Sequence, residues 1–115
     1  GADVTLTETG CGTHTPPVVV LGGAYRIVQE SLSNAVKHGG PHPTIEVRLA
    51  CEPSTLSIDV VNTVAGSAAA NLEPGNGVSG MAERASVLGG TFDTVQTADT
   101  FAVQASLPTG RSELT

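Results

Sequence analysis

Alternation of apolar and polar residues predicts five β-strands in this chain. The first strand alternates in the way expected of a strand with one buried face. The second and third are separated only by Glu52–Ser54, and the last two only by a turn near Ala98 and Asp99, so each pair is expected to form a hairpin. The predicted strands are residues 2–9, 44–51, 55–62, 91–97 and 100–107.

A helical period of apolar residues replaces this alternation in two segments. The first helix is expected to begin at Pro16–Pro17, with Thr15 as its N-cap, and to run to about His38. Its apolar stripe consists of Leu21, Ala24, Val28, Leu32 and Ala35, flanked by Tyr25, Ile27 and Val36. The second helix is shorter and covers residues 77–88. Two glycines follow each helix, which is typical of a helix end.

Residues 63–76 show no sustained period and carry little apolar bulk. A long structureless loop in a compact domain is more often functional or mobile than incidental, so we expect this segment to act as a lid. The order β, α, β, β, lid, α, β, β predicts an α+β sandwich, with a mixed, mostly antiparallel sheet and helices on one face. We expect one domain over residues 1–108 and a frayed tail over residues 109–115.

Composition restricts the function classes that this fold can serve. The 115 residues are 39% hydrophobic, which is enough for one domain with a real core. The net charge of −6, with five Lys plus Arg, argues against a nucleic-acid surface, so any anion site must be local. The sequence contains neither an apolar run long enough to span a membrane nor a signal-peptide pattern. We therefore expect a cytoplasmic piece of a longer protein, and the sequence leaves membrane anchoring of that protein open.

Motif searches narrow the chemistry further. Cys11 and Cys51 lack the spacing of a metal site, and two thiols in a chain with a sizeable core suggest a reducing compartment. The sequence alone neither places these cysteines together nor excludes a disulfide between them. There is no GxSxG motif, no HExxH motif and no Cys paired with a His motif, which argues against a hydrolase.

The polar face of the first helix is one candidate site. Glu30 and Asn34 lie one turn apart, and Lys37 and His38 follow within the next turn. An asparagine oxygen suits Mg²⁺, which takes few protein ligands and completes its octahedron with water and phosphate oxygens. The basic side chains could meet those phosphates. Taken alone, the same row is more simply explained as a solvated face with an ion pair between Arg26 and Glu30.

The glycine-rich segment Gly75–Gly80 is a second candidate site. It leads into a helix start, where free amides and the helix dipole favour a phosphate. Its letters match the dinucleotide-binding GxGxxG, but an irregular loop rather than a strand precedes it. Taken alone, it is a flexible linker with a helix cap. Asn62, with Gly66 four residues on, and Thr100 could line the same pocket, although each is also ordinary turn or strand composition.

Together these segments resemble a known family. Tyr25–His38 resembles the N box of sensor histidine kinases of the nitrate-sensor and DesK-like class, and Gly77–Arg84, followed by Leu88–Gly90, resembles the glycine-rich box and following helix of that class. The two boxes occur in the right order, and the resemblance extends over about residues 2–108. It implies the Bergerat (GHKL-type) fold of a catalytic, ATP-binding domain.

The resemblance also implies roles for individual residues. Asn34 would hold Mg²⁺, Glu30 would orient a water or support the metal, and Lys37 with His38 would approach the phosphates of ATP. The glycine-rich box would cradle the phosphate chain under the lid, and its members are Gly75, Gly77, Val78, Gly80 and Met81. Thr100 matches the late-strand threonine that the family places beside adenine.

One box departs from the family pattern. The usual DxGxG becomes Asn62–Gly66, with Val64 in place of the first glycine, so the residue that would receive the adenine amino group is Asn62. An amide oxygen accepts that hydrogen bond without charge assistance, and the amide NH₂ needs a partner of its own. We therefore expect weak ATP binding.

The implied function is that of an ATP-dependent protein-histidine kinase in a two-component phosphorelay. The domain would bind Mg-ATP and donate the γ-phosphoryl group to a histidine on a separate dimerisation domain, from which a response regulator takes it. Phosphoryl transfer needs mainly positioning and charge neutralisation, so these residues are chemically adequate. The chain alone is not expected to autophosphorylate.

Two other functions stay open. One is a degenerate Bergerat module that works through protein contacts, which the altered box at Asn62 favours. The other is an anti-sigma-factor-like serine kinase, which shares the fold and the boxes. An acceptor histidine on an upstream helical hairpin would distinguish the sensor kinase from the serine kinase.

Overall fold

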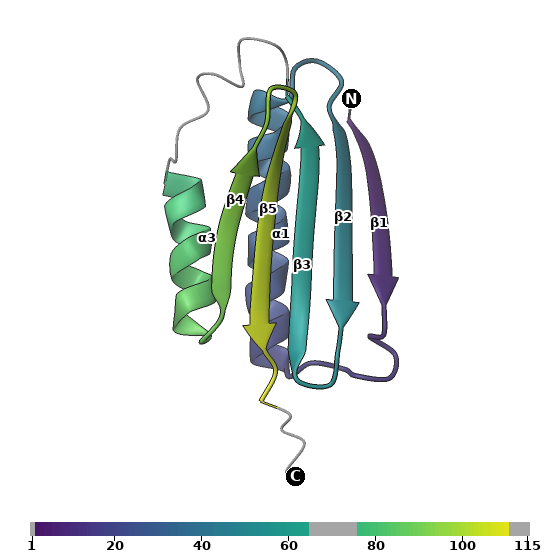
Figure 1. Ribbon diagram of the computed structural model, residues 1–115, viewed down its shortest axis with the longest axis vertical. Coiled ribbons are helices and arrows are strands. Elements are labelled where there is room, and N and C mark those ends of the chain that lie inside the picture. The colour runs from purple at the N-terminus through teal and green to yellow at the C-terminus, as the bar shows by residue number, and fades with distance from the viewer. Residues whose placement is uncertain (1, 65–75, 111–115) are drawn as a thin grey trace.

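The computed structural model describes residues 2–64 and 76–110, and the strands in these ranges form one five-stranded sheet backed by helices on one face (Figure 1). The strands are β1 (Asp3–Thr9), β2 (Thr44–Cys51), β3 (Thr55–Thr63), β4 (Thr91–Gln96) and β5 (Thr100–Pro108), and the helices are α1 (Val18–His38) and α3 (Asn76–Val87). The order across the sheet is β1-β2-β3-β5-β4. β1 is parallel to β2, and every other neighbouring pair is antiparallel. Both predicted hairpins are confirmed.

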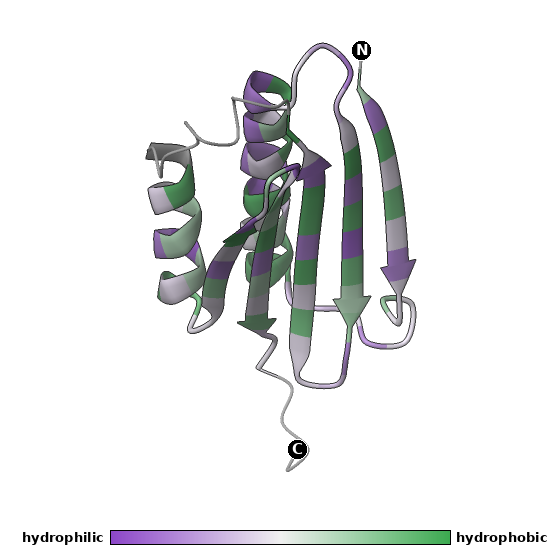
Figure 2. Ribbon diagram, turned by 45° about the horizontal axis from the view of Figure 1, so that its top comes forward, coloured by the Kyte–Doolittle hydropathy of each residue, from purple (hydrophilic) through white to green (hydrophobic). Residues whose placement is uncertain are grey.

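The core lies between the sheet and the helices. Alternate residues of β3 are buried, and Figure 2 shows a matching alternation of hydrophobic and hydrophilic residues as bands along the strands. The antiparallel register pairs Ile58 with Ala105 and Val60 with Val103, so β3 and β5 bury the same face. From the helices, Ile27 and Met81 are buried in the same core. Each such aliphatic side chain contributes about 1.5–3 kcal/mol by burial.

Helix α1 ends at His38 as predicted, but it begins differently. Its N-cap is Pro17, which makes no side-chain cap hydrogen bond, so the prediction of Thr15 as the cap is wrong. The Thr15 hydroxyl instead donates to the carbonyl oxygen of Cys11 at 3.1 Å. The helix thus begins after a proline, whose ring fixes φ, and not after a residue that caps it with a hydroxyl group.

The buried face of α1 is also displaced from the predicted stripe. It runs through Val20, Ala24, Ile27, Ser31 and Ala35, whereas Leu21 is 42% exposed and Tyr25 and Val36 are exposed. Two neighbouring lines of apolar residues satisfy a helical period equally well, and the sheet covers the line that contains Ile27. Pattern alone therefore assigned Leu21 to the wrong environment.

Strand β1 was predicted to be half-buried, and this is wrong. All its residues are exposed, and Leu6 retains 64% of its accessible surface. β1 is an edge strand that pairs only with β2, and α1 packs mainly on the more central strands of the sheet. An alternating pattern predicts a strand, but the cover over its apolar face depends on where the helices lie.

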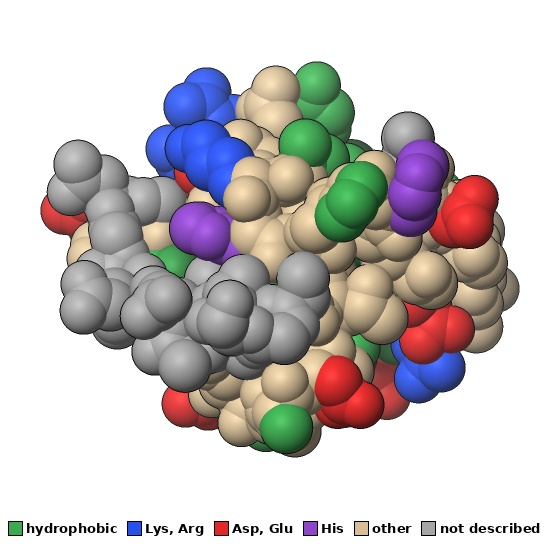
Figure 3. Space-filling model, turned by 90° about the horizontal axis from the view of Figure 1, so that it is seen from above, with side chains coloured by type: hydrophobic (Ala, Val, Ile, Leu, Met, Phe, Trp, Pro, Cys, Tyr) green, Lys and Arg blue, Asp and Glu red, His purple; other side chains and the backbone are tan. Residues whose placement is uncertain are grey.

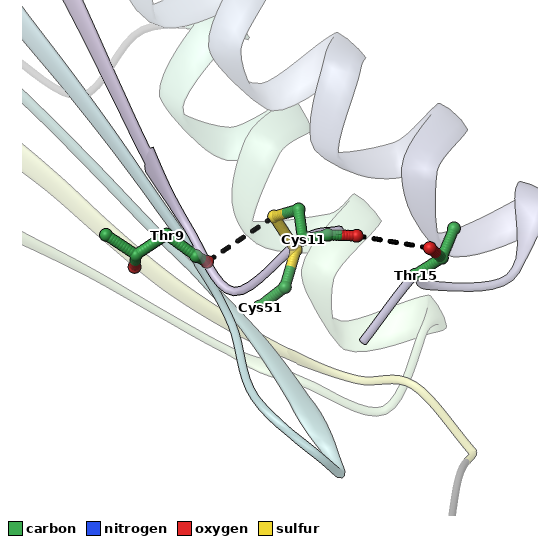
Figure 4. The surroundings of a disulfide bond; sticks show 4 residues. All are labelled: Thr9, Cys11, Thr15 and Cys51. Atoms are coloured by element: carbon green, nitrogen blue, oxygen red, sulfur yellow. Dashed lines mark hydrogen bonds between the residues drawn. A yellow bond between two sulfur atoms is a disulfide. The ribbon is translucent and has the colours of Figure 1, made fainter. Parts of the chain in front are cut away.

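Cys11 and Cys51 form a disulfide, with their Cα atoms 4.7 Å apart (Figure 4). The inference from two free thiols to a reducing compartment is therefore withdrawn. The parallel register pairs Thr9 with Ala50, and this pairing brings Cys11, two residues after Thr9, close to Cys51, the residue after Ala50. The sequence could not show this proximity, because it depends on a parallel pairing across an intervening helix.

The packed domain extends slightly beyond the predicted boundary at residue 108. Thr109 is only 3% exposed, and its amide donates to the carbonyl oxygen of Ser54 at 3.0 Å. Residues 111–115 of the predicted tail lie outside the described ranges. Within the described ranges, no helix combines the length and the apolar character needed to cross a bilayer.

Candidate functional site

Four separate segments bring the predicted site residues to one end of the molecule. α1 ends there, β3 ends there, α3 begins there and the β4–β5 turn lies there (Figure 1). The connections at the opposite end are the β1–α1 loop, the β2–β3 turn and the α3–β4 turn. Residues that are distant in the sequence therefore share one end, because successive helices and strands alternate in direction.

The polar row of α1 lies at this end. Glu30, Asn34 and His38 are half-buried, whereas Lys37 is exposed. Viewed from this end, a histidine lies next to basic side chains (Figure 3). Lys37 and His38 occupy the last turn of α1, where the helix dipole favours positive charge. In the part of the chain that the structure describes, no ion pair joins Arg26 and Glu30, the pair offered as the simpler explanation of this row, while Arg48 pairs with Glu46 at 2.9 Å.

Asn62 occupies a buried position near the end of β3. It is 4% exposed and shares the helix-covered face with Val60 and Ile58. Its amide nitrogen donates to the carbonyl oxygen of Thr63 at 2.9 Å. The amide NH₂ thus has the partner it was expected to need, and this orientation assigns the acceptor role to the side-chain oxygen.

Thr100 does not share the side of the sheet on which Asn62 lies. The register pairs Thr100 with Thr63, while Phe101 is the residue opposite Asn62. Paired residues point to the same face, so Thr100 belongs to the face that the helices leave open. Its hydroxyl lies 2.7 Å from that of Thr97 within the β4–β5 turn. The predicted placement of Thr100 in one pocket with Asn62 is therefore wrong, because Thr100 lies one residue before the position opposite Asn62 and so faces the other side of the sheet.

The start of α3 supplies the part of the glycine-rich box that the structure describes. Val78 is half-buried against the core, and Gly80 is exposed with nothing near its missing side chain. Met81 is buried, and its sulfur lies 3.2 Å from the hydroxyl oxygen of Ser31. The Met81 side chain therefore joins α3 to α1 through its contact with Ser31. Gly66, Gly75 and most of the predicted lid lie outside the described residues, and Gly77 belongs to the first turn of α3.

The described residues limit how a metal could be held. They contain no group of three or more His, Cys, Asp or Glu side chains that could bind a metal ion. Mg²⁺ commonly takes few protein ligands and completes its octahedron with phosphate oxygens and water. The half-buried amide of Asn34 and the carboxylate of Glu30 are hard oxygen donors suited to it.

The predicted turn near Ala98 and Asp99 lies beside the end of β3, and its hydrogen-bond network was not predicted from the sequence. The Thr97 hydroxyl bonds with the Asp99 carboxylate at 3.1 Å and accepts from the amide of Thr100 at 3.0 Å. The Asp99 carbonyl oxygen accepts from the amide of Val64 at 2.9 Å. This turn therefore fixes the backbone just after β3. Thr and Asp side chains commonly bond to nearby backbone groups in turns, so Thr97 and Asp99 between two strands carried a signal for this turn in the sequence.

Comparison with known proteins agrees with this geometry. The sequence model described as histidine kinase-, DNA gyrase B- and HSP90-like ATPase matches residues 21–109, most of the chain. The chain belongs to this ATPase family. The predicted kinship with the ATP-binding domain of sensor histidine kinases is confirmed, while the nitrate-sensor and DesK-like subclass stays a prediction.

A curated relative of this ATPase domain is the sensor histidine kinase YxjM of Bacillus subtilis (strain 168). The two are 32% identical over 110 residues, which is 94% of this chain and 26% of the relative. The chain thus spans about a quarter of that protein.

Solved structures show the same fold. The blue-light activated histidine kinase of Erythrobacter litoralis EL346 aligns with a TM-score of 0.76 at 17% identity, covering 99% of this chain and 37% of that one. The nucleotide-free catalytic domain of the histidine kinase ThkA aligns with a TM-score of 0.70 at 13% identity, covering 94% and 80%. The Bergerat fold is therefore confirmed.

Proposed function

We propose that this ATPase domain binds Mg-ATP at the end formed by α1, β3 and α3, and that it donates the γ-phosphoryl group to a histidine on a separate dimerisation domain. A response regulator would then receive the group. The observation that carries the proposal is the convergence of Asn34, Asn62 and the α3 N-terminus on one end of a fold whose family is ATP-binding.

Each wall of the site has a distinct task in this proposal. Asn34 supplies an amide oxygen to the metal, and Glu30 orients a water or supports the metal. Lys37 and His38 offset phosphate charge, and the first amides of α3 face the phosphate chain together with the helix dipole. Asn62 accepts a hydrogen bond from the adenine amino group through its side-chain oxygen.

ATP supplies the phosphoryl group, and the chain supplies position and charge. In the transfer, the bond between the γ-phosphorus and the bridging oxygen breaks, and a bond to an imidazole nitrogen of the acceptor forms. Little further chemistry is needed from the protein, because such transfers are accelerated mainly by alignment and electrostatic stabilisation. The acceptor histidine lies on the other domain, so the 115-residue chain should bind nucleotide without phosphorylating itself.

Titration with a fluorescent ATP analogue, with and without Mg²⁺, tests the proposal. The wild-type chain should bind weakly and more tightly with Mg²⁺, and Asn34→Ala should remove most of the Mg²⁺ dependence. Gln29→Ala is the matched control, since Gln29 is exposed on another side of α1 and should change nothing. Absence of binding at millimolar analogue would favour the degenerate module, and a Mg²⁺ dependence that survives in Asn34→Ala would exclude the metal role.

A further inference from the structure

The disulfide between Cys11 and Cys51 lies at the end of the molecule opposite the proposed nucleotide site (Figures 1 and 4). It ties the loop that follows β1 to the last residue of β2. We propose that this bond is a reversible redox element that fixes one wall of an apolar groove. The inference does not rest on nucleotide binding.

The groove lies between the β1–β2 edge of the sheet and the first half of α1, and it has a volume of about 470 Å³. Both cysteines line it, together with Thr15 and Pro16 of the loop. Its remaining lining is largely apolar and includes Leu6, Leu21, Tyr25, Val28, Leu49 and Leu56. The loop therefore forms a wall of the groove, and the disulfide fastens that wall to the sheet.

The two cysteines differ in exposure. Cys11 lies on the loop and is half-buried, whereas Cys51 is 4% exposed within the core. A reducing thiolate can therefore approach the sulfur of Cys11 from the groove side. Exchange depends on such access, so Cys11 is the sulfur that is attacked.

The surrounding backbone is held by bonds that do not involve the disulfide. The amides of Thr13 and His14 donate to the carbonyl oxygen of Gly10 at 3.1 and 2.8 Å, and the Thr15 hydroxyl donates to the Cys11 carbonyl. The Cys11 sulfur lies 3.6 Å from the carbonyl oxygen of Thr9, which can accept a hydrogen bond from a thiol there. Cys51 belongs to the hydrophobic core, but most of that core is formed by other residues, so the reduced chain should remain folded.

The proposed exchange uses a dithiol as the reductant. A dithiol thiolate attacks the Cys11 sulfur, the bond to Cys51 breaks, and the Cys51 sulfur leaves with the electron pair and takes a proton. The second thiol of the reductant then displaces Cys11, which is protonated in turn. Two electrons and two protons pass to the protein, giving two cysteine thiols and one oxidised dithiol.

Opening the bond should have two measurable effects. The loop wall is freed from β2, so the groove should open and bind more of an apolar dye, by several-fold. The unfolded chain also loses a cross-link that closes about 40 residues, so the melting temperature should fall by roughly 10 °C.

The test compares the 115-residue chain in its air-oxidised state and after dithiothreitol, without denaturant. Alkylation followed by mass spectrometry counts thiols, circular dichroism verifies folding, and anilinonaphthalene sulfonate reports the groove. We expect two thiols, retained structure and increased dye binding after reduction, with full reversal on reoxidation. The double variant Cys11→Ala/Cys51→Ala should show the reduced dye binding whether or not dithiothreitol is present.

Three outcomes would overturn the proposal. The first is a chain whose cysteines are already free after air oxidation. The second is a disulfide that reacts only in denaturant, which would make it a fixed cross-link. The third is equal dye binding by the folded oxidised and reduced chains. Should the double variant fail to fold, Cys11→Ala alone leaves the buried Cys51 in place and provides the same comparison.

Discussion

Asn62 has two hydrogen-bonding roles at one buried position. Its NH₂ group donates to the Thr63 carbonyl, which leaves the side-chain oxygen as the acceptor for an adenine amino group. The sequence predicted the acceptor role through resemblance and required some partner for the NH₂. It could not identify that partner, because a neighbouring carbonyl becomes available only when the strand ends in a particular conformation.

Asn62→Asp should strengthen binding of the ATP analogue and destabilise the fold. A carboxylate accepts more strongly than an amide, so we expect affinity to rise by about 1 kcal/mol, roughly fivefold. The same change places an oxygen against the Thr63 carbonyl, which should lower the free energy of unfolding by about 1–3 kcal/mol. Analogue titration and urea denaturation measure the two effects separately. An unchanged affinity would count against Asn62 as the base acceptor.

Thr109→Val should stabilise the domain. The Thr109 hydroxyl is buried and has no hydrogen-bond partner within the described part of the chain. Replacing it with a methyl group of similar shape removes an unpaired polar group, so we expect about 1 kcal/mol of added unfolding free energy in urea denaturation. Thr109→Ser is the control, since it keeps the hydroxyl and loses the methyl group and should destabilise. A loss of stability in Thr109→Val would show that the hydroxyl is paired.

At the scale of elements, the C-terminal end of α1 and the two hairpins were predicted closely, whereas the cap and the buried face of α1 were not. Turn residues and glycines act locally, so their signals can be read from the sequence. Whether Leu21 or Ile27 faces the core depends on the position of the sheet, which no local signal carries. The misplacement of Thr100 has the same origin, because the side that a strand residue faces is fixed by register.

Replacing either of two glycines in or next to α1 by alanine should change the free energy of unfolding in opposite directions. Gly22 is exposed within α1 with nothing near its missing side chain, so Gly22→Ala should add about 1 kcal/mol through helix propensity. Gly39 caps α1 from a buried position, where a Cβ would lie 2.5 Å from the Ala35 carbonyl oxygen. Gly39→Ala should therefore cost about 1–3 kcal/mol.

Urea denaturation of the two alanine variants beside wild type provides the measurement. Similar destabilisation of both would mean that Gly22 is needed for packing that the structure does not show. Stabilisation by Gly39→Ala would mean that the turn after α1 relaxes freely around the new methyl group.

At the scale of the whole molecule, local patterns gave the order of elements along the chain but not their order in space. β5 lies between β3 and β4, and β1 is parallel to β2 across an intervening helix. The turn residues that predict hairpins cannot predict either arrangement, since both depend on pairing between strands that are distant in the sequence. The juxtaposition of Cys11 and Cys51 follows from the second arrangement, which is why it was missed.

This arrangement predicts unequal local stability across the sheet. β3 pairs with strands on both sides and buries one face under the helices, whereas β1 pairs on one side only and is exposed throughout. In native-state hydrogen exchange, amides of β3 should open only with global unfolding, and those of β1 should open at a clearly lower free energy. Peptide-resolved exchange at increasing urea distinguishes global from local opening. Only the opening free energy of β3 amides should fall with urea as steeply as the free energy of global unfolding. Equal protection of β1 and β3 would show instead that the disulfide at Cys11 makes the edge strand part of one cooperative unit.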